Sequence, residues 1–187
     1  GQRSLSWYRI GRLVHEQSLF LAGSWGSRLE GGSLRDSLLS VSSRYFWRAS
    51  GKTVLFVGFA ADKGSALDLD HELMLGGDTG LRGYPLRYQT GTARALLTVE
   101  GRYFTNWYPL RLARVGAAVF ADIGRTWGAS ALAVPELGTL RDVGIGLRFG
   151  NTRSALGNVL HVDLAFPLDG DPSVKSMQFL LKTYKSF

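Results

Sequence analysis

The sequence predicts an all-β protein, a transmembrane antiparallel up-and-down β-barrel with about eight strands in this chain. Apolar residues recur with period two over segments of about ten to fourteen residues, each bounded by Gly, Pro, Asn, Asp or Ser. The opposite face is mostly glycine, alanine, serine and isolated charges, which suits a crowded barrel interior better than the hydrated surface of a soluble sheet. Aromatic residues such as Tyr45, Trp47, Trp107 and Tyr108 gather at segment ends, as they do at the water interfaces of membrane barrels.

Two units are expected along the chain. Residues 1–17 fit neither period well and are expected to form an N-terminal arm or an extra strand, whereas residues 18–187 form the barrel. The expected strands are residues 18–30, 37–49, 53–62, 93–104, 114–126, 142–150, 159–168 and 176–187. Shorter links are expected at 50–52, 105–111 and 151–158, and outer loops at 31–36, 63–92, 127–141 and 169–175. Alternation of short turns with longer loops is typical of outer-membrane barrels.

The alternation also assigns each face. In residues 114–126, Val119 lies on the apolar face, whereas Phe120 and Asp122 lie on the other face. Glu100 lies on the polar face of the preceding segment, and Ile145 on the apolar face of the following one. The apolar face is expected to meet lipid.

The composition limits the classes of partner. The chain has 187 residues, near the usual size of one domain, and no apolar run approaches the roughly 18 residues of a spanning helix. Twenty-two Lys and Arg against 15 Asp and Glu give a net charge of +7, which favours an anionic partner: nucleic acid, phospholipid or lipopolysaccharide. Because the alternating pattern indicates a membrane barrel, outer-membrane lipid and lipopolysaccharide are expected, and nucleic acid is not.

No catalytic site, metal site or cofactor is predicted. The chain has no cysteine, and its three histidines, His15, His71 and His161, show no ligand spacing. Serine, histidine and aspartate occur without a nucleophile-elbow pattern, and Glu100 with Asp122 suits an arginine partner better than acid–base catalysis. A non-enzymatic protein is expected.

Residues 76–85, GGDTGLRGYP, have the glycines and proline of a turn, together with an arginine and a tyrosine that a turn does not need. Asp122 lies on the enclosed face of its strand, where a carboxylate needs a cationic or hydrogen-bonding partner. A guanidinium fork can bond both oxygens of one carboxylate. We therefore expect Arg82 to reach Asp122, with Glu100 sharing the contact; the alternative is a surface turn with a solvated arginine.

These residues resemble the motifs of the Omp-eighty-five superfamily of outer-membrane barrels. In that family a long extracellular loop carries a (V/L)RG(F/Y) motif, matched here by Leu81, Arg82, Gly83 and Tyr84. The loop arginine bonds the aspartate of an F-x-D-x-G strand motif, matched here by Phe120, Asp122 and Gly124. The chain also ends in Phe187, like the terminal signal that the barrel-assembly machinery reads, and five expected strands follow the loop, which is the family count.

The resemblance implies a bacterial outer-membrane protein that inserts or translocates proteins or lipids and depends on the barrel-assembly machinery for its own insertion. Family members carry periplasmic transport-associated domains and about sixteen strands, and this chain has room for neither. Two architectures stay open: a plugged eight-stranded barrel that is a possible homodimer, or half of a sixteen-stranded barrel completed by a second copy or an absent N-terminal part. Two further functions also stay open: a structural barrel that binds lipopolysaccharide or a partner, and the anchor of a longer secreted enzyme such as a patatin-like phospholipase.

Overall fold

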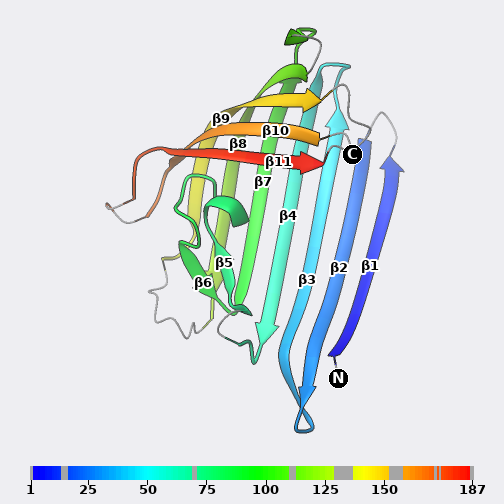
Figure 1. Ribbon diagram of the computed structural model, residues 1–187, viewed down its shortest axis with the longest axis vertical. Coiled ribbons are helices and arrows are strands. Elements are labelled where there is room, and N and C mark those ends of the chain that lie inside the picture. Colours follow the sequence, from blue (N-terminus) through cyan, green and yellow to red (C-terminus); the bar gives the residue numbers. More distant parts are fainter. Residues whose placement is uncertain are drawn as a thin grey trace.

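A single large antiparallel sheet dominates the fold (Figure 1). The structure, a computed structural model, describes residues 2–13, 17–68, 71–109, 113–128, 137–151, 158–170, 172 and 174–185. The sheet has nine strands in the order β1-β2-β3-β4-β7-β8-β9-β10-β11. They are β1 (Gln2–Leu13), β2 (Gln17–Glu30), β3 (Ser33–Arg48), β4 (Thr53–Ser65), β7 (Ala93–Phe104), β8 (Ala113–Trp127), β9 (Leu140–Asn151), β10 (Asn158–Pro167) and β11 (Gln178–Lys185). All eight expected strands are therefore present, and the N-terminal segment adds an edge strand.

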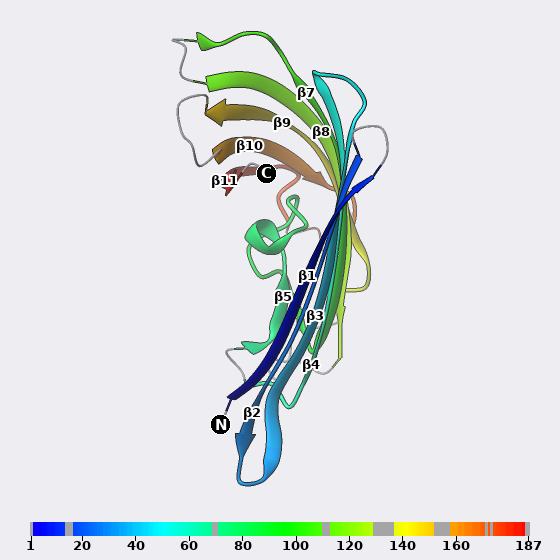
Figure 2. The ribbon, with the colours of Figure 1, turned by 90° about the vertical axis from the view of Figure 1, so that its right-hand side faces the viewer.

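The long link between β4 and β7 has structure of its own. It contains a two-stranded sheet, β5 (Leu73–Leu75) with β6 (Gln89–Gly91), and the short 3-10 helix η2 (Gly77–Thr79). We call residues 66–92 the motif loop. The sheet curves so that β5 and η2 lie on its concave side (Figure 2). Among the described residues, no helix is long or apolar enough to cross a membrane.

Strand β8 shows how the sequence pattern sets the two faces. Its side chains alternate between buried and exposed from Gly116 to Trp127. Phe120 and Asp122 are buried on the concave side, whereas Val119 is 62% exposed on the convex side. Val119 pairs with Ile145 of β9, which is 54% exposed. The face that carries the apolar side chains is thus the outward face, the reverse of a soluble sheet.

The hairpin between β2 and β3 is shorter than expected. Residues 31–36 were expected as an outer loop, but only Gly31 and Gly32 join the two strands, with φ of 56° and 82°. Positive φ at both central residues is the type I′ geometry, which matches the twist of paired strands, so the ladder continues to the turn. That expectation of a longer link was wrong.

The sheet does not close on itself. Strands β1 and β11 stand at the two ends of the strand order and do not pair within the described part of the chain. Every neighbouring pair in between is antiparallel. The sequence predicts a barrel of about eight strands that could close within this chain, but in the described part of the chain the sheet is open, so closure within the chain was wrongly expected.

Candidate functional site

The motif loop returns on itself just before its arginine. The amides of Gly76 and Gly77 donate to the carbonyl oxygens of Gly80 and Leu81, each at 3.1 Å. Gly80 has φ of 110° and Leu81 has φ of 56°, so the chain passes through left-handed conformations at two successive residues. A positive φ is uncommon for a residue with a side chain, and burial of Leu81 with 0% exposure keeps it there.

A small apolar core holds the loop against the sheet. It consists of Leu75, Leu81 and Tyr84 from the loop and Leu140 from β9, all 1% exposed or less. Leucines on the concave face of the sheet would otherwise meet water, so their mutual burial favours the folded-back loop. The loop arginine is thereby delivered to the middle of the concave face.

The guanidinium of Arg82 binds the carboxylate of Asp122. Nε donates to Oδ2 at 2.8 Å and Nη2 donates to Oδ1 at 3.1 Å, which is the bidentate geometry expected from the sequence. Both side chains are buried, with Arg82 at 7% and Asp122 at 2% exposure. The guanidinium also lies 3.3 Å from the ring centroid of Phe120, a cation–π contact. Phe120 and Asp122 of the F-x-D-x-G segment thus both contact the loop arginine.

The same arginine reaches two further strands. Its Nη1 donates to Glu100 Oε2 at 2.9 Å and to Asp163 Oδ2 at 3.2 Å. Glu100 belongs to β7, Asp122 to β8 and Asp163 to β10, so one side chain ties the loop to three strands. Burial alone would lower the pKa of Arg82, but the bonds to Asp122 and Glu100 raise the pKa above its ordinary value. The loop arginine therefore stays charged.

A second arginine, Arg148 of β9, completes the cluster and was not predicted. Its side chain has 0% exposure. Nε and Nη2 donate to Glu100 Oε1 at 2.9 and 2.8 Å, and Nη1 donates to Asp163 Oδ1. Arg102 of β7 adds a third guanidinium, whose Nε donates to Glu100 Oε1 at 2.8 Å. We call Arg82, Arg102 and Arg148, together with Glu100, Asp122 and Asp163, the lock cluster.

Two glycines of the motifs are needed for space. A Cβ on Gly83 would lie 2.6 Å from the Cβ of Asp142 and 2.9 Å from the amide nitrogen of Pro167. A Cβ on Gly124 would lie 3.1 Å from the carbonyl oxygen of Ala95 and 3.2 Å from Leu75 of the loop. Gly83 shows no positive φ, so its role is close approach to β9 and β10, whereas Gly80 supplies the unusual backbone angle.

Tyr84, the last residue of the loop motif, anchors the other side of the loop. Its hydroxyl donates to the carbonyl oxygen of Asp169 at 2.7 Å or of Arg141 at 2.8 Å, and accepts from the amide of Asp169 at 3.1 Å. Burial raises the pKa of the phenol above its ordinary value, so the hydroxyl remains a donor. Its ring stacks on Tyr88, with centroids 5.4 Å apart.

Replacing Tyr84 with phenylalanine is expected to weaken loop attachment by about 0.5–1.5 kcal/mol, because the half-buried carbonyl and amide groups of Asp169 lose a hydrogen-bond partner. The measurement is the rate at which protease cuts the motif loop of the purified protein. Tyr103→Phe is the control, since Tyr103 lies outward on β7 and is 49% exposed. Equal cleavage rates for the two variants would show that the hydroxyl does not hold the loop.

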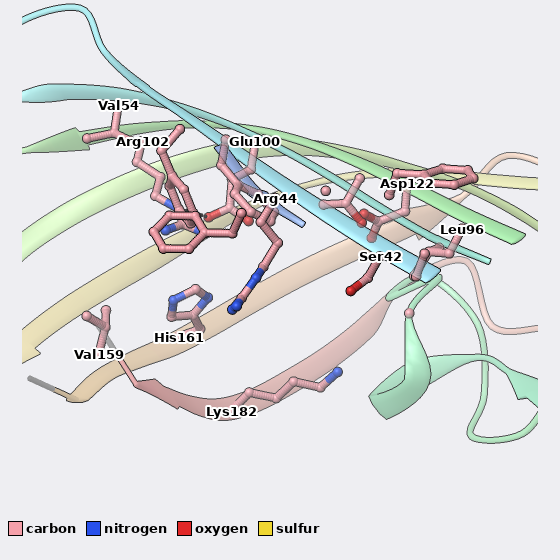
Figure 3. Close-up of a pocket in the computed structure, with 18 of the residues that line it drawn as sticks. Ser42, Arg44, Val54, Leu96, Glu100, Arg102, Asp122, Val159, His161 and Lys182 are labelled. Carbon is pink, nitrogen blue, oxygen red and sulfur yellow. Dashed lines mark hydrogen bonds and ion pairs between the residues drawn. The ribbon is translucent and has the colours of Figure 1, made fainter. Parts of the chain in front are cut away.

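Further contacts fasten the rest of the motif loop. Gln89 of β6 accepts from the amide of Thr126 at 3.0 Å, and Arg94 of β7 donates to the carbonyl oxygen of Met74 at 2.8 Å. Lys182 of β11 donates to the carbonyl oxygen of Gly77 at 3.0 Å. A cavity of about 620 Å³ remains beside η2, and Arg44, Arg102 and Lys182 lie around it (Figure 3).

One cluster of possible metal ligands lies outside the lock. Asp36, Asp68 and His71 place their ligand atoms within 4.8 Å of one another. His71 Nδ1 lies 2.6 Å from Asp36 Oδ2, and Asp68 accepts from Arg28 at 2.7 Å. Histidine spacing did not predict this group, because its members come from β3 and the motif loop. The contacts of these three residues with one another and with Arg28 account for the geometry.

The structure therefore brings together Arg82, Asp122, Glu100 and Phe120, and it places Leu81, Gly83, Tyr84 and Gly124 around them. Phe187, the expected terminal signal, lies outside the described residues. The buried charges are directed at one another, so the arrangement positions the loop and exposes no nucleophile of its own. No family model matches this chain, and no curated protein matches it.

Proposed function

We propose that this protein is a bacterial outer-membrane β-barrel protein of the insertion and translocation superfamily, with a motif loop locked onto its inner wall. One observation carries the proposal: Arg82 of the RGY segment binds Asp122 of the FADIG segment on the concave side of an antiparallel sheet. Such a lock fixes a loop inside a barrel, where it controls the space that a client or solute would cross.

The outward face supports a membrane location. Large apolar side chains are exposed on it along successive strands, among them Phe59, Leu97, Val99, Val119, Ile123, Val143, Ile145, Leu147, Phe179 and Leu181. Soluble proteins rarely expose contiguous apolar surface on this scale. Strands of this length also match the span of a bilayer. Lipid is the solvent that suits this face.

Strand parity indicates how such a sheet would close. Because nine successive strands alternate in direction, β1 and β11 run the same way. Pairing them directly would make a parallel seam, whereas bacterial outer-membrane barrels of this kind are antiparallel with an even strand count. An odd number of further strands gives antiparallel seams at both edges. In lipid an unpaired edge costs several kcal/mol for each backbone group, so the edges need partners.

The odd number of strands also argues against a second copy of this chain as the other half of the barrel wall. Two copies related by an axis along the barrel would join β1 of one to β11 of the other in parallel at both seams. Two copies related by a perpendicular axis would pair in antiparallel fashion, but one copy would then lie upside down in the membrane. We therefore propose that strands outside these 187 residues, rather than a homodimer, complete the wall.

Replacing Val119 with arginine tests the membrane location. At an exposed site in water the change is expected to cost less than about 0.5 kcal/mol, but near the bilayer midplane it costs about 2–4 kcal/mol. The loss of stability is measured from the shift of the urea midpoint of folding in lipid vesicles. Leu86→Arg is the control, because Leu86 is 66% exposed in the motif loop. A negligible loss for Val119→Arg would place this face in water and defeat the proposal.

A further inference from the structure

A further buried carboxylate, that of Asp142, lies next to the lock cluster. Asp142 of β9 is 1% exposed, and neither of its carboxylate oxygens has a hydrogen-bond partner among the described residues. Leaving an ionised carboxylate buried and unpaired costs far more free energy than leaving a neutral one. The state of Asp142 therefore has to be explained by its neighbours.

The nearest acidic neighbour is Asp122 itself. Asp122 and Asp142 stand directly opposite each other in the β8–β9 register and share the concave face. Directly opposed residues in an antiparallel pair have Cβ atoms roughly 5 Å apart, close enough for the two carboxyl groups to interact. Two like charges at this separation in a buried site cannot both be ionised without a shared cation.

The guanidinium of Arg82 already bonds other carboxylates. Four hydrogen bonds from the side chain of Arg82 go to Asp122, Glu100 and Asp163, and none reaches Asp142. The lock cluster holds three guanidinium groups and three carboxylates, so its charges balance without Asp142. An ionised Asp142 would make the group carry a net negative charge.

Among the described residues, the other elements around Asp142 bring no cation that bonds its carboxylate. From the motif loop, Gly83 lies against its Cβ and Tyr84 offers a phenol whose hydroxyl already bonds Arg141 and Asp169. From β10, Pro167 is its partner in the register and has no side-chain charge. Glu100 of β7 and Asp163 of β10 accept hydrogen bonds from Nη1 of Arg82, and the Nζ of Lys182 of β11 donates to the carbonyl oxygen of Gly77.

We infer that Asp142 is a proton-binding site: it carries a proton in the locked state and directs that proton to Asp122. When the motif loop leaves the sheet, Asp142 and Asp122 meet water and Asp142 loses its proton to solvent. Closing the loop takes the proton up again. Loop attachment is then linked to proton concentration. Because only the locked state holds the proton above the ordinary pKa of an aspartate, about 4, loop attachment weakens as the pH rises from there towards alkaline values. This proton site depends on the geometry of the lock and not on how the sheet is closed.

Infrared spectroscopy of the wild-type protein tests the protonation directly. A protonated carboxyl group has a C=O stretch distinct from that of a carboxylate, and at neutral pH we expect one such band. Asp142→Asn should remove the band, and Asp169→Asn should leave it, because Asp169 is paired with Arg141 at 2.7 Å. Absence of the band in the wild-type protein at neutral pH, whether Asp142 is then bare or holds a metal ion, would overturn the inference.

The linkage has its own measurement. Because the chain lacks cysteine, a single Leu86→Cys substitution can carry a spin label on the exposed part of the loop. Between about pH 5 and about pH 9 the ratio of released to locked loop is expected to rise about tenfold or more in the labelled wild type. With Asp142→Asn added, the ratio should change less than about twofold, because the amide stays neutral throughout. The same pH dependence in both proteins would overturn the inference.

Discussion

Replacing Arg148 with methionine is expected to lower the free energy of unfolding by about 3–5 kcal/mol. The side chain has 0% exposure and donates to both Glu100 and Asp163, which are 2% and 3% exposed. Methionine fills similar space but supplies no charge, so the two buried carboxylates lose a shared cation. Because all three residues lie on strands, they cannot escape to solvent without breaking the sheet.

The midpoint of urea unfolding in lipid vesicles or detergent measures this loss. Arg141→Met is the matched control, since it removes an arginine–aspartate pair from the same strand β9. The side chain of Arg141 is 58% exposed, so the control should cost no more than about 1 kcal/mol. Arg148→Lys is expected to fall between the two, because it keeps the charge but loses the fork that spans Glu100 and Asp163. Equal losses for Arg148→Met and Arg141→Met would show that the lock cluster does not stabilise the sheet.

The Arg82–Asp122 contact could be predicted from the sequence for a physical reason. Period-two alternation in residues 114–126 assigns Asp122 to the enclosed face, and an enclosed carboxylate requires a cation. The glycine-rich segment around Arg82 offered such a cation on a loop able to fold back. Strand β8 alternates as that reasoning requires, with Val119 exposed and Phe120 buried.

Alternation in residues 142–150 and 159–168 also puts Arg148 and Asp163 on the face opposite the apolar side chains, but nothing in the sequence joins the two residues. Their contact depends on the β9–β10 register, in which Gly146 stands opposite Asp163 and Arg148 opposite His161. A slip of one residue would send each side chain to the other face. Gly146 also leaves room for the contact, because a Cβ there would meet both Asp163 and the Nη1 of Arg148. The register and the space beside Gly146 both depend on how two strands pair, so neither can be predicted from the sequence of one strand alone.

Closure of the sheet escaped prediction for a different reason. The alternating segments of the sequence predicted eight of the nine strands of the large sheet, whereas the link expected at residues 31–36 is a two-residue hairpin at Gly31 and Gly32. Whether the edges of β1 and β11 meet depends on total strand number and stagger, which are set by whatever completes the wall. The sequence of each segment determines that strand, but it does not determine how many strands complete the wall.

Replacing Arg82 with alanine is expected to release the motif loop, raising its cleavage by protease by about two orders of magnitude or more. The loss of three buried carboxylate contacts corresponds to about 3–5 kcal/mol of loop attachment, and each 1.4 kcal/mol is about tenfold in population. Unlike Arg148, Arg82 is on a segment that can swing away, so the strands keep most of their stability and the loss appears as opening of the loop.

Asp122→Ala should release the loop to a similar degree, and the double variant should cost little more than either single change. Two residues in direct contact show coupling of about 0.5–3 kcal/mol, whereas independent sites add to within about 0.5 kcal/mol. Arg82→Ala combined with Asp169→Ala provides the additive reference, since Asp169 binds Arg141 and not Arg82. Additive losses for Arg82→Ala and Asp122→Ala would show that the two side chains act independently.

The same variant connects the lock to function. If the motif loop occupies the path through a completed barrel, Arg82→Ala should increase single-channel conductance in planar bilayers, and Asp122→Ala should increase it equally. Tyr103→Phe, which leaves the lock intact, should conduct as the wild type does. A loop that opens to protease while conductance stays at zero would mean that other side chains fill the interior, and the protein would then act as a plugged barrel. Because loop release and conductance are measured on the same variants, a failed lock and a failed pore give different results.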